Sequence, residues 1–234
     1  MKKKVLGIIP ARGGSKGIPK KNLQEIAGKP LVAYPITEAK RSEFITELVV
    51  STDSTELASY LDNLGQKYIL RPNEIAQDQS PVIETVFHVL EVLKKEGKEF
   101  DLVILLQPTS PFWKGAQLDE VIGLFEDDAI EGVVSVVPST ESHPARMYDK
   151  ESNDFLKPLI ADAETLRRQD LSPVYSRNGC FYAVKTSALY KHNSLMPPVK
   201  KGYVMDPYWC LTIDTPRDLL LARFMAEEWN SLES

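Results

Sequence analysis

Short apolar runs that alternate with amphipathic stretches constrain the fold of this chain more than any other feature. The runs lie at residues 5–9, 48–51, 68–70, 101–106 and 132–137. Continuous apolar runs of this length are typical of parallel strands, which helices cover on both faces. Helical stretches separate them, at 31–41, from about 55 to 63, at 81–95, and after residue 111 to about 127. The alternation predicts an α/β fold with three layers and a mostly parallel, Rossmann-like sheet.

A basic, glycine-rich loop follows the first apolar run. Between Pro10 and residue 22 it carries Arg12, Lys16, Lys20 and Lys21, together with three glycines. Glycine lets backbone N–H groups turn inward around an anion, so a loop of this kind after a first buried strand predicts a phosphate site. Neither the G-x-x-x-x-G-K-[ST] motif nor G-x-G-x-x-G is present. The alternative is a solvated basic loop, which runs against the acidic charge of the chain.

Length, charge and cysteine content narrow the class of protein. With 234 residues and 43% hydrophobic content, the chain is expected to form one domain over 1–234. A formal net charge of −5 argues against nucleic-acid binding, and no apolar run reaches the ~20 residues of a membrane span. The basic N-terminus precedes an apolar run too short for a signal peptide. Two cysteines, Cys180 and Cys210, do not make a disulfide framework, so we expect a soluble cytoplasmic protein.

The alternation stops at residue 138. Residues 139–176 are polar and interrupted by prolines, and they lack a long helical stripe. A structureless loop of this length is uncommon in a compact domain, so we expect a hairpin arm that leaves the core. The chain then returns to the sheet at 179–185. Thr215 and Pro216 predict the start of a final helix that continues to about residue 229.

The loop and several later motifs together resemble the acylneuraminate cytidylyltransferases, or CMP-sialic acid synthetases. The loop matches their P-A-R-x-x-S-K-G-[IL]-x-x-K-N pattern. The other matches are Leu70-Arg71-Pro72, Leu105-Leu106-Gln107-Pro108-Thr109-Ser110-Pro111, Asn178-Gly179 followed by Tyr182, and Ile213-Asp214-Thr215. They occur in family order from about residue 5 to 225. The resemblance implies the nucleotide-diphospho-sugar transferase type of fold, with the arm at about 139–176 serving dimerisation.

The resemblance also implies roles for individual residues. The residues expected to bind CTP are Ala11, Arg12, Gly14, Ser15, Lys16, Lys21, Asn22, Arg71 and Ser80. The residues expected to contact the sugar acid are Gln107, Arg146, Arg168, Tyr182, Leu195 and Met196, with the two arginines on the excursion meeting its carboxylate. Part of the excursion reaches the neighbouring subunit in that family, which implies a homodimer. Lys16, Lys21 and Asp214 are the expected catalytic residues.

Two carboxylates near strand ends have alternative interpretations. Asp214 is expected to be the metal ligand, for Mg²⁺ or Mn²⁺, although it could instead serve the dipole at the start of the last helix. For Asp53 we prefer a role as a helix cap over a role in the site. The family usually has Asp-Ile-Asp where this chain has Thr212-Ile213-Asp214, so one carboxylate is missing. Leu195-Met196 replaces an aromatic pair, which leaves the identity of the sugar open.

The expected reaction is transfer of CMP from CTP to the anomeric hydroxyl of a nine-carbon 2-keto sugar acid, with release of pyrophosphate. Catalysis of this kind is mainly positioning and cationic stabilisation of phosphoryl oxygens. Sialic acid is the default substrate; legionaminic and pseudaminic acids are close alternatives, and the eight-carbon Kdo is more distant. A nucleotidyltransferase acting on sugar 1-phosphates is another possibility. So is a non-catalytic nucleotide-binding dimer that lost activity with the missing carboxylate.

Overall fold

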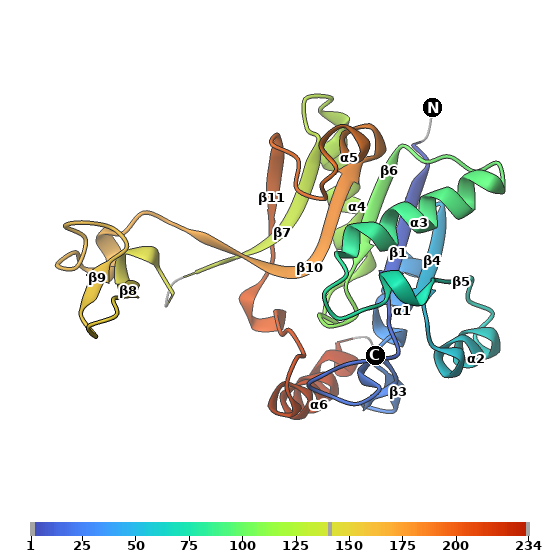
Figure 1. The fold of residues 1–234 in the computed structure, drawn as a ribbon, viewed down its shortest axis with the longest axis horizontal. Coiled ribbons are helices and arrows are strands. Elements are labelled where there is room, and N and C mark those ends of the chain that lie inside the picture. Colours follow the sequence, from blue (N-terminus) through green and yellow to red (C-terminus); the bar gives the residue numbers. More distant parts are fainter. Residues whose placement is uncertain (1–2, 140–141, 233–234) are drawn as a thin grey trace.

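A seven-stranded sheet forms the centre of the computed structural model, which describes residues 3–139 and 142–232 (Figure 1). The strand order is β11-β7-β10-β6-β1-β4-β5. Neighbouring strands are parallel except that β10 is antiparallel to both β6 and β7. The strands are β1 (Val5–Pro10), β4 (Glu47–Thr52), β5 (Tyr68–Leu70), β6 (Leu102–Leu106), β7 (Gly132–Pro138), β10 (Tyr175–Lys185) and β11 (Lys200–Val204). The mostly parallel sheet predicted from the apolar runs is confirmed.

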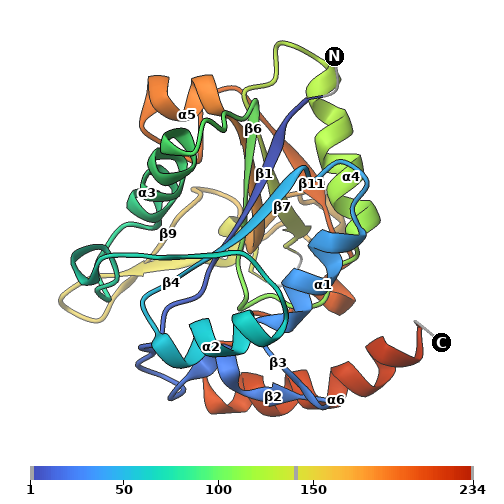
Figure 2. The ribbon, with the colours of Figure 1, turned by 90° about the vertical axis from the view of Figure 1, so that its right-hand side faces the viewer.

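Helices cover both faces of the sheet, as predicted (Figure 2). One face packs against α1 (Ala33–Arg41), α2 (Thr55–Asn63) and α4 (Gly115–Gly123). The other packs against α3 (Val82–Lys95) and α5 (Thr186–His192). β1 and β6 supply buried residues to both of these cores, because successive side chains of a strand point to opposite faces. Their continuous apolar sequence is thereby explained.

A third core lies beyond the carboxyl ends of the strands. It joins α6 (Pro216–Ser231) to Ile18 of the basic loop and to the small ribbon of β2 (Glu25–Ile26) and β3 (Lys29–Pro30). The Thr215 hydroxyl accepts a hydrogen bond from the Asp218 N–H, and the Asp218 carboxylate accepts one from the Thr215 N–H. This capping box confirms the predicted helix start. α6 is consequently held beside the basic loop.

The excursion after β7 forms an arm that stands away from the main sheet (Figure 1). Its two short strands, β8 (Tyr148–Lys150) and β9 (Leu156–Pro158), pair only with each other, and they are antiparallel. Apolar side chains on it are exposed, above all Phe155 at 70% and Leu156 at 60%. Residues 140 and 141, within the expected arm, lie outside the described residues. The predicted hairpin arm is therefore present, and its apolar surface is uncovered in the single chain.

The remaining elements are short. The sequence analysis did not predict α5 or β11. Single-turn helices occur at Lys21–Leu23, Asn73–Ile75, Leu124–Glu126, Pro144–Arg146, Arg168–Asp170 and Pro207–Trp209. In the described part of the chain no helix combines the length and hydrophobicity needed to cross a membrane.

Candidate active site

Two pockets lie side by side at the carboxyl ends of the strands. The first has a volume of about 330 Å³ and is lined by the loops that follow β1, β5 and β6. The second, of about 290 Å³, lies between α3, β10 and the segment after α5. Gln107 and Val82 line both pockets, so the two are neighbours with a shared wall. This is the edge at which open α/β sheets bind ligands.

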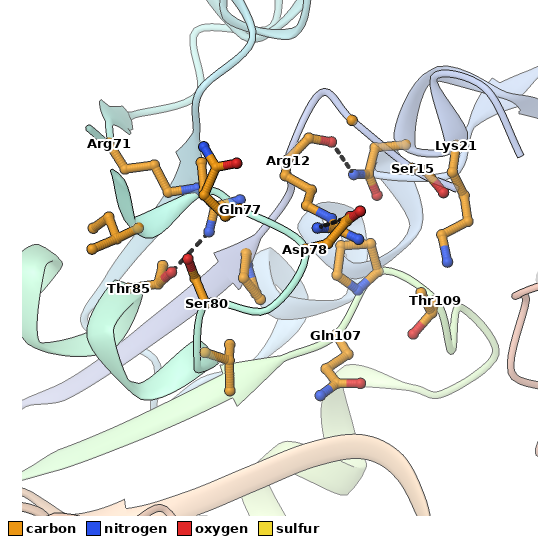
Figure 3. A pocket seen from close by; sticks show the side chains of 17 residues that line it. Arg12, Ser15, Lys21, Arg71, Gln77, Asp78, Ser80, Thr85, Gln107 and Thr109 are labelled. Atoms are coloured by element: carbon orange, nitrogen blue, oxygen red, sulfur yellow. Dashed lines mark hydrogen bonds and ion pairs between the residues drawn. The ribbon is translucent and has the colours of Figure 1, made fainter. Parts of the chain in front are cut away.

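The basic loop forms one wall of the first pocket. Figure 3 shows Ser15 and Lys21 on one side, Arg71, Gln77, Ser80 and Thr85 on the other, and Arg12 with Asp78 between them. Gly14 also lines the pocket. Asn22 is 8% exposed and its side-chain amide donates to the Arg12 carbonyl at 2.8 Å, which fixes the bend of the loop. Ala11 is buried outside the pocket wall, with its N–H bonded to the Ser51 carbonyl at 2.9 Å.

Every cationic side chain of the loop pairs with a carboxylate. Arg12 Nη1 lies 2.7 Å from Asp78 Oδ1, and Lys16 Nζ lies 3.0 Å from Asp78 Oδ2. The hydrogen bond from Lys16 is the main cause that holds the pKa of the Asp78 carboxyl below its ordinary value. Lys16 itself is not part of the pocket wall; it reaches the pocket through Asp78.

Lys20 and Lys21 pair with carboxylates outside the pocket wall. Lys20 Nζ contacts Glu56 at 2.7 Å, and Lys21 Nζ contacts the Asp214 carboxylate at 2.9 Å. Lys21 Nζ also donates to the Ile213 carbonyl at 2.9 Å. The positive charges of the loop are therefore paired with carboxylates of the same chain.

The loop is pressed against the segment that carries Asp214. A Cβ placed on Gly17 would lie 2.3 Å from the Asp214 carbonyl oxygen, a separation that real Cβ atoms essentially never show. Lys21 holds the same segment through its two hydrogen bonds. Thus Lys21 at the pocket and Asp214 outside its wall form one structural unit.

The buried guanidinium of Arg71 lies at the end of the first pocket away from Lys21. Arg71 is 8% exposed; its Nη1 donates to Thr85 Oγ1 at 2.8 Å and its Nη2 lies 3.8 Å from Asp53 Oδ1. Its Nε is buried without a hydrogen-bond partner among the described residues. Burial lowers the pKa of Arg71, while the neighbouring Asp53 carboxylate opposes that shift. Because buried polar groups are normally hydrogen-bonded, this unpartnered donor requires a specific explanation.

The preferred interpretation of Asp53 as a helix cap is wrong. Ser54 caps α2, and its hydroxyl accepts from the Leu57 N–H at 3.2 Å. Asp53 precedes the cap by one residue and faces the basic loop instead. Its Oδ1 accepts from the Gly13 N–H at 3.0 Å, so it supports the loop and Arg71 together.

The second pocket contains four of the predicted sugar-acid residues. Gln107, Tyr182, Leu195 and Met196 line it, and so does Arg177, which the sequence analysis did not single out. A bulge in β10 builds this wall: four residues separate Arg177 from Tyr182, whereas only one separates their partners Val136 and Val134 in β7. Gly179 sits inside the bulge with a φ of +77°, which favours glycine, and Gln107 Oε1 would lie 3.4 Å from a Cβ there.

Arg146 and Arg168 are not brought to either pocket. Both are exposed on the arm, and they line neither pocket of the same chain. A single chain therefore presents the two pockets without these arginines.

Thr212 occupies the position of the missing carboxylate. Its hydroxyl donates to the Asn178 carbonyl at 3.3 Å and lies 3.4 Å from Ser110 Oγ. Asp214 has a side chain that is 66% exposed and bonded to Lys21. Within residues 3–139 and 142–232, no group of three or more His, Cys, Asp or Glu side chains could hold a metal ion.

The family model described as Cytidylyltransferase matches residues 6–219. The chain belongs to the cytidylyltransferase family. One relative is the CMP-N,N'-diacetyllegionaminic acid synthase of Legionella pneumophila, 34% identical over 96% of this chain and 97% of that protein. The N-acylneuraminate cytidylyltransferase of Escherichia coli is 29% identical over 98% of this chain, which spans only 54% of that longer protein.

Among solved structures, a CMP:2-keto-3-deoxy-manno-octonic acid synthetase complexed with CTP superimposes on this cytidylyltransferase with a TM-score of 0.70. It covers 96% of this chain and 99% of its own, at 20% identity. At that identity the likeness establishes the fold alone. The predicted nucleotide-diphospho-sugar transferase type of sheet is therefore confirmed.

Two charged residues of this cytidylyltransferase's pockets were missed by the sequence analysis. Arg177 directly precedes the Asn178-Gly179 motif, so its position next to a quoted motif was an available signal. Asp78 lies seven residues after Arg71 in a segment without a recognised motif, and only its contacts with Arg12 and Lys16 reveal it.

Proposed function

We propose that this cytidylyltransferase transfers CMP from CTP to the anomeric hydroxyl of a nine-carbon 2-keto sugar acid. The hydroxyl oxygen attacks the α-phosphorus of CTP and loses its proton, and the bond from the α-phosphorus to the bridging oxygen of pyrophosphate breaks. The observation that carries the proposal is the pair of adjoining pockets that share Gln107, one rich in cations and the other partly apolar. Such neighbours bring an acceptor and a phosphoryl donor together in one site.

The first pocket suits CTP. Arg71 lines the end of the pocket away from Lys21, where a guanidinium suits a polar base edge. Lys21 lies on the opposite side, on the loop whose cations and backbone suit phosphates. Cationic groups that face developing charge on phosphoryl oxygens stabilise the transition state. On this proposal Lys21, Lys16 and Arg12 serve the phosphates, and Asn22 and Ser80 serve the nucleoside.

The second pocket suits an N-acylated sugar acid. Leu195 and Met196 offer apolar surface for an acyl methyl group, Tyr182 and Gln107 offer hydrogen bonds to hydroxyls, and Arg177 offers charge to a carboxylate. One relative matched over 97% of its length, at 34% identity, is named for N,N'-diacetyllegionaminic acid. Another, matched over 96% of its length at 28% identity, is named for pseudaminic acid. We therefore place N,N'-diacetyllegionaminic acid first among the candidates and N-acetylneuraminic acid second.

A homodimer is part of the proposal. Arg146 and Arg168 are exposed on an arm that stands away from the sheet, and exposed apolar side chains, including Phe155, lie beside them in the chain. A partner subunit that covered this apolar surface would also receive the two arginines near its second pocket. Phe155→Asp should therefore give a monomer in light scattering, together with a loss of activity. A variant that stays dimeric and active would contradict the role of the arm.

A divalent ion, Mg²⁺ or Mn²⁺, is also proposed. Asp214 fits as its protein ligand, because its exposed carboxylate lies next to the phosphate loop and Mg²⁺ commonly takes one or two carboxylates plus substrate phosphates. When bound, the ion supplies positive charge to the phosphates. Asp214→Asn keeps the shape but removes the charge, and should lose nearly all turnover. Near-normal activity of Asp214→Asn at low Mg²⁺ would favour the helix-dipole role.

The deciding experiment measures pyrophosphate release from CTP with a panel of acceptors. The panel contains N,N'-diacetyllegionaminic, N-acetylneuraminic, pseudaminic and Kdo acids, and a sugar 1-phosphate. Release that depends on one nine-carbon acid supports the proposal and identifies the acceptor. Release only with the sugar 1-phosphate contradicts it. Binding of CTP without release for any acceptor would support the non-catalytic alternative.

A further inference from the structure

The segment between β5 and α3 forms a separate wall of the first pocket. It runs from Arg71 to Pro81 and contains the single-turn helix Asn73–Ile75. Its own side chains fasten it: Gln77 Nε2 donates to the Asn73 carbonyl at 2.6 Å, and Ser80 Oγ donates to the Glu74 carbonyl at 3.1 Å. The segment is thus held by its own hydrogen bonds, and Asp78 within it faces the basic loop.

Asp78 links this wall to the opposite one. Its two carboxylate oxygens contact different cations, Arg12 at 2.7 Å and Lys16 at 3.0 Å. Figure 3 shows the Asp78 side chain beside the Arg12 guanidinium, between the two groups of lining residues. Both contacts are accessible, since the side chains of Arg12 and Asp78 are 34% and 36% exposed and that of Lys16 is 77% exposed. A carboxylate of the pocket lining therefore pairs with two cations of the basic loop.

A bound triphosphate and Asp78 need the same cations. Placing a second anion beside Arg12 and Lys16 with Asp78 still in contact would bring like charges together, which is unfavourable. We propose that Asp78 competes with the phosphates for Arg12 and Lys16. It pairs with both cations before CTP binds, releases them when CTP binds, and pairs with them again as pyrophosphate leaves. The inference rests on the proposed function for the identity of its ligand.

The two ion pairs of Asp78 set the expected size of the change in ligand affinity. Exposed ion pairs each change an equilibrium by a factor of about 1.4 to 5.4, so removing both competing contacts should strengthen anion binding by about 2- to 30-fold. A purely structural role for Asp78 predicts the opposite, because a disordered wall would weaken binding. The direction of the change therefore separates the two roles.

The test compares binding of inorganic pyrophosphate and of CTP by titration calorimetry. Asp78→Asn removes the charge and keeps the shape, and Asp78→Ala serves as a second variant with the same expected result. Glu56→Gln is the matched control, because Glu56 pairs with Lys20 in the same loop but lies outside the first pocket. We expect tighter binding of both ligands by the Asp78 variants and a change of less than about twofold in the control. Product inhibition by pyrophosphate should strengthen by the same factor.

Two outcomes would overturn the inference, and they are distinguishable. In the first outcome, the natural protein binds CTP and pyrophosphate, and the Asp78 variants keep its Tm but bind both ligands equally well or more weakly. The competitor role of Asp78 then fails, and the proposed function stands. If the natural protein binds neither ligand, the proposed function fails and the inference fails with it. Neither measurement requires a sugar acid, so an unidentified acceptor does not affect the result.

Discussion

The contact between Gly17 and Asp214 can be broken by adding one methyl group. In Gly17→Ala the new Cβ would start 2.3 Å from the Asp214 carbonyl oxygen. Reaching ordinary van der Waals contact at 3.4 Å requires the loop and the Asp214 segment to separate by about 1.1 Å, the difference between these two distances. Both groups in the clash are backbone atoms or fixed to the backbone, so no side-chain rotation relieves it.

The separation should act on catalysis more than on folding. Lys21 Nζ reaches the same segment through two hydrogen bonds of 2.9 Å, to the Ile213 carbonyl and the Asp214 carboxylate. Misplacement of reacting groups by about 1 Å can cost about 10²-fold in rate, so kcat should fall by about that factor. Overpacking costs roughly 1–3 kcal/mol in the free energy of unfolding, which for a chain of this size lowers Tm by a few degrees.

Steady-state pyrophosphate release and thermal denaturation measure the two effects. Gly14→Ala is the control for folding: it adds the same methyl group to the same loop, where nothing lies within 4 Å of the added Cβ. Its Tm should match that of the natural protein. If Gly17→Ala retains its kcat, the close packing of the loop on the Asp214 segment is not required for catalysis, and the assignment of these residues to one unit is refuted.

Four further substitutions test individual roles. Lys21→Ala should lower kcat by about 10²–10³-fold, through loss of a charged contact to the phosphates. Arg71→Ala should instead raise mainly the KM for CTP; equal effects confined to KM in both variants would contradict these roles. Thr212→Asp should lower the Mg²⁺ concentration for half-maximal rate, and an unchanged requirement would exclude residue 212 from the metal's ligands. Thr215→Ala should cost about 1 kcal/mol in the free energy of unfolding, because it removes the cap of α6. Hydrogen bonds from Thr215 hold the pKa of Asp218 below its ordinary value, so this stabilisation is complete above about pH 4 and is lost as pH falls through the lower folded pKa. Thermal denaturation of both proteins at pH 7 and pH 3 should show a smaller difference at pH 3.

The central strands were predicted from the sequence because their own residues are buried. β1 and β6 are apolar throughout because both of their faces lie in the core, and that requirement is visible locally. β11 was not predicted, since its sequence Lys-Lys-Gly-Tyr-Val is mostly exposed at the edge of the sheet and pairs only with β7. A polar edge strand depends on a distant partner for its hydrogen bonds, and no local pattern records that partner.

The candidate site likewise has features that the sequence predicted and features that only the structure revealed. The sequence by itself determined that residues 11–22 form a basic, glycine-rich loop after a buried strand, because charge, glycine content and the strand are all local properties. Only the tertiary structure decided the partners of that loop. The order β1-β4-β5 brings Asp53 and Asp78 to it, and α6 with its preceding segment brings Asp214. These pairings depend on which strands are neighbours, and many residues separate the paired side chains in the sequence. The sequence therefore identified the cations, and only the fold determined which carboxylates pair with them.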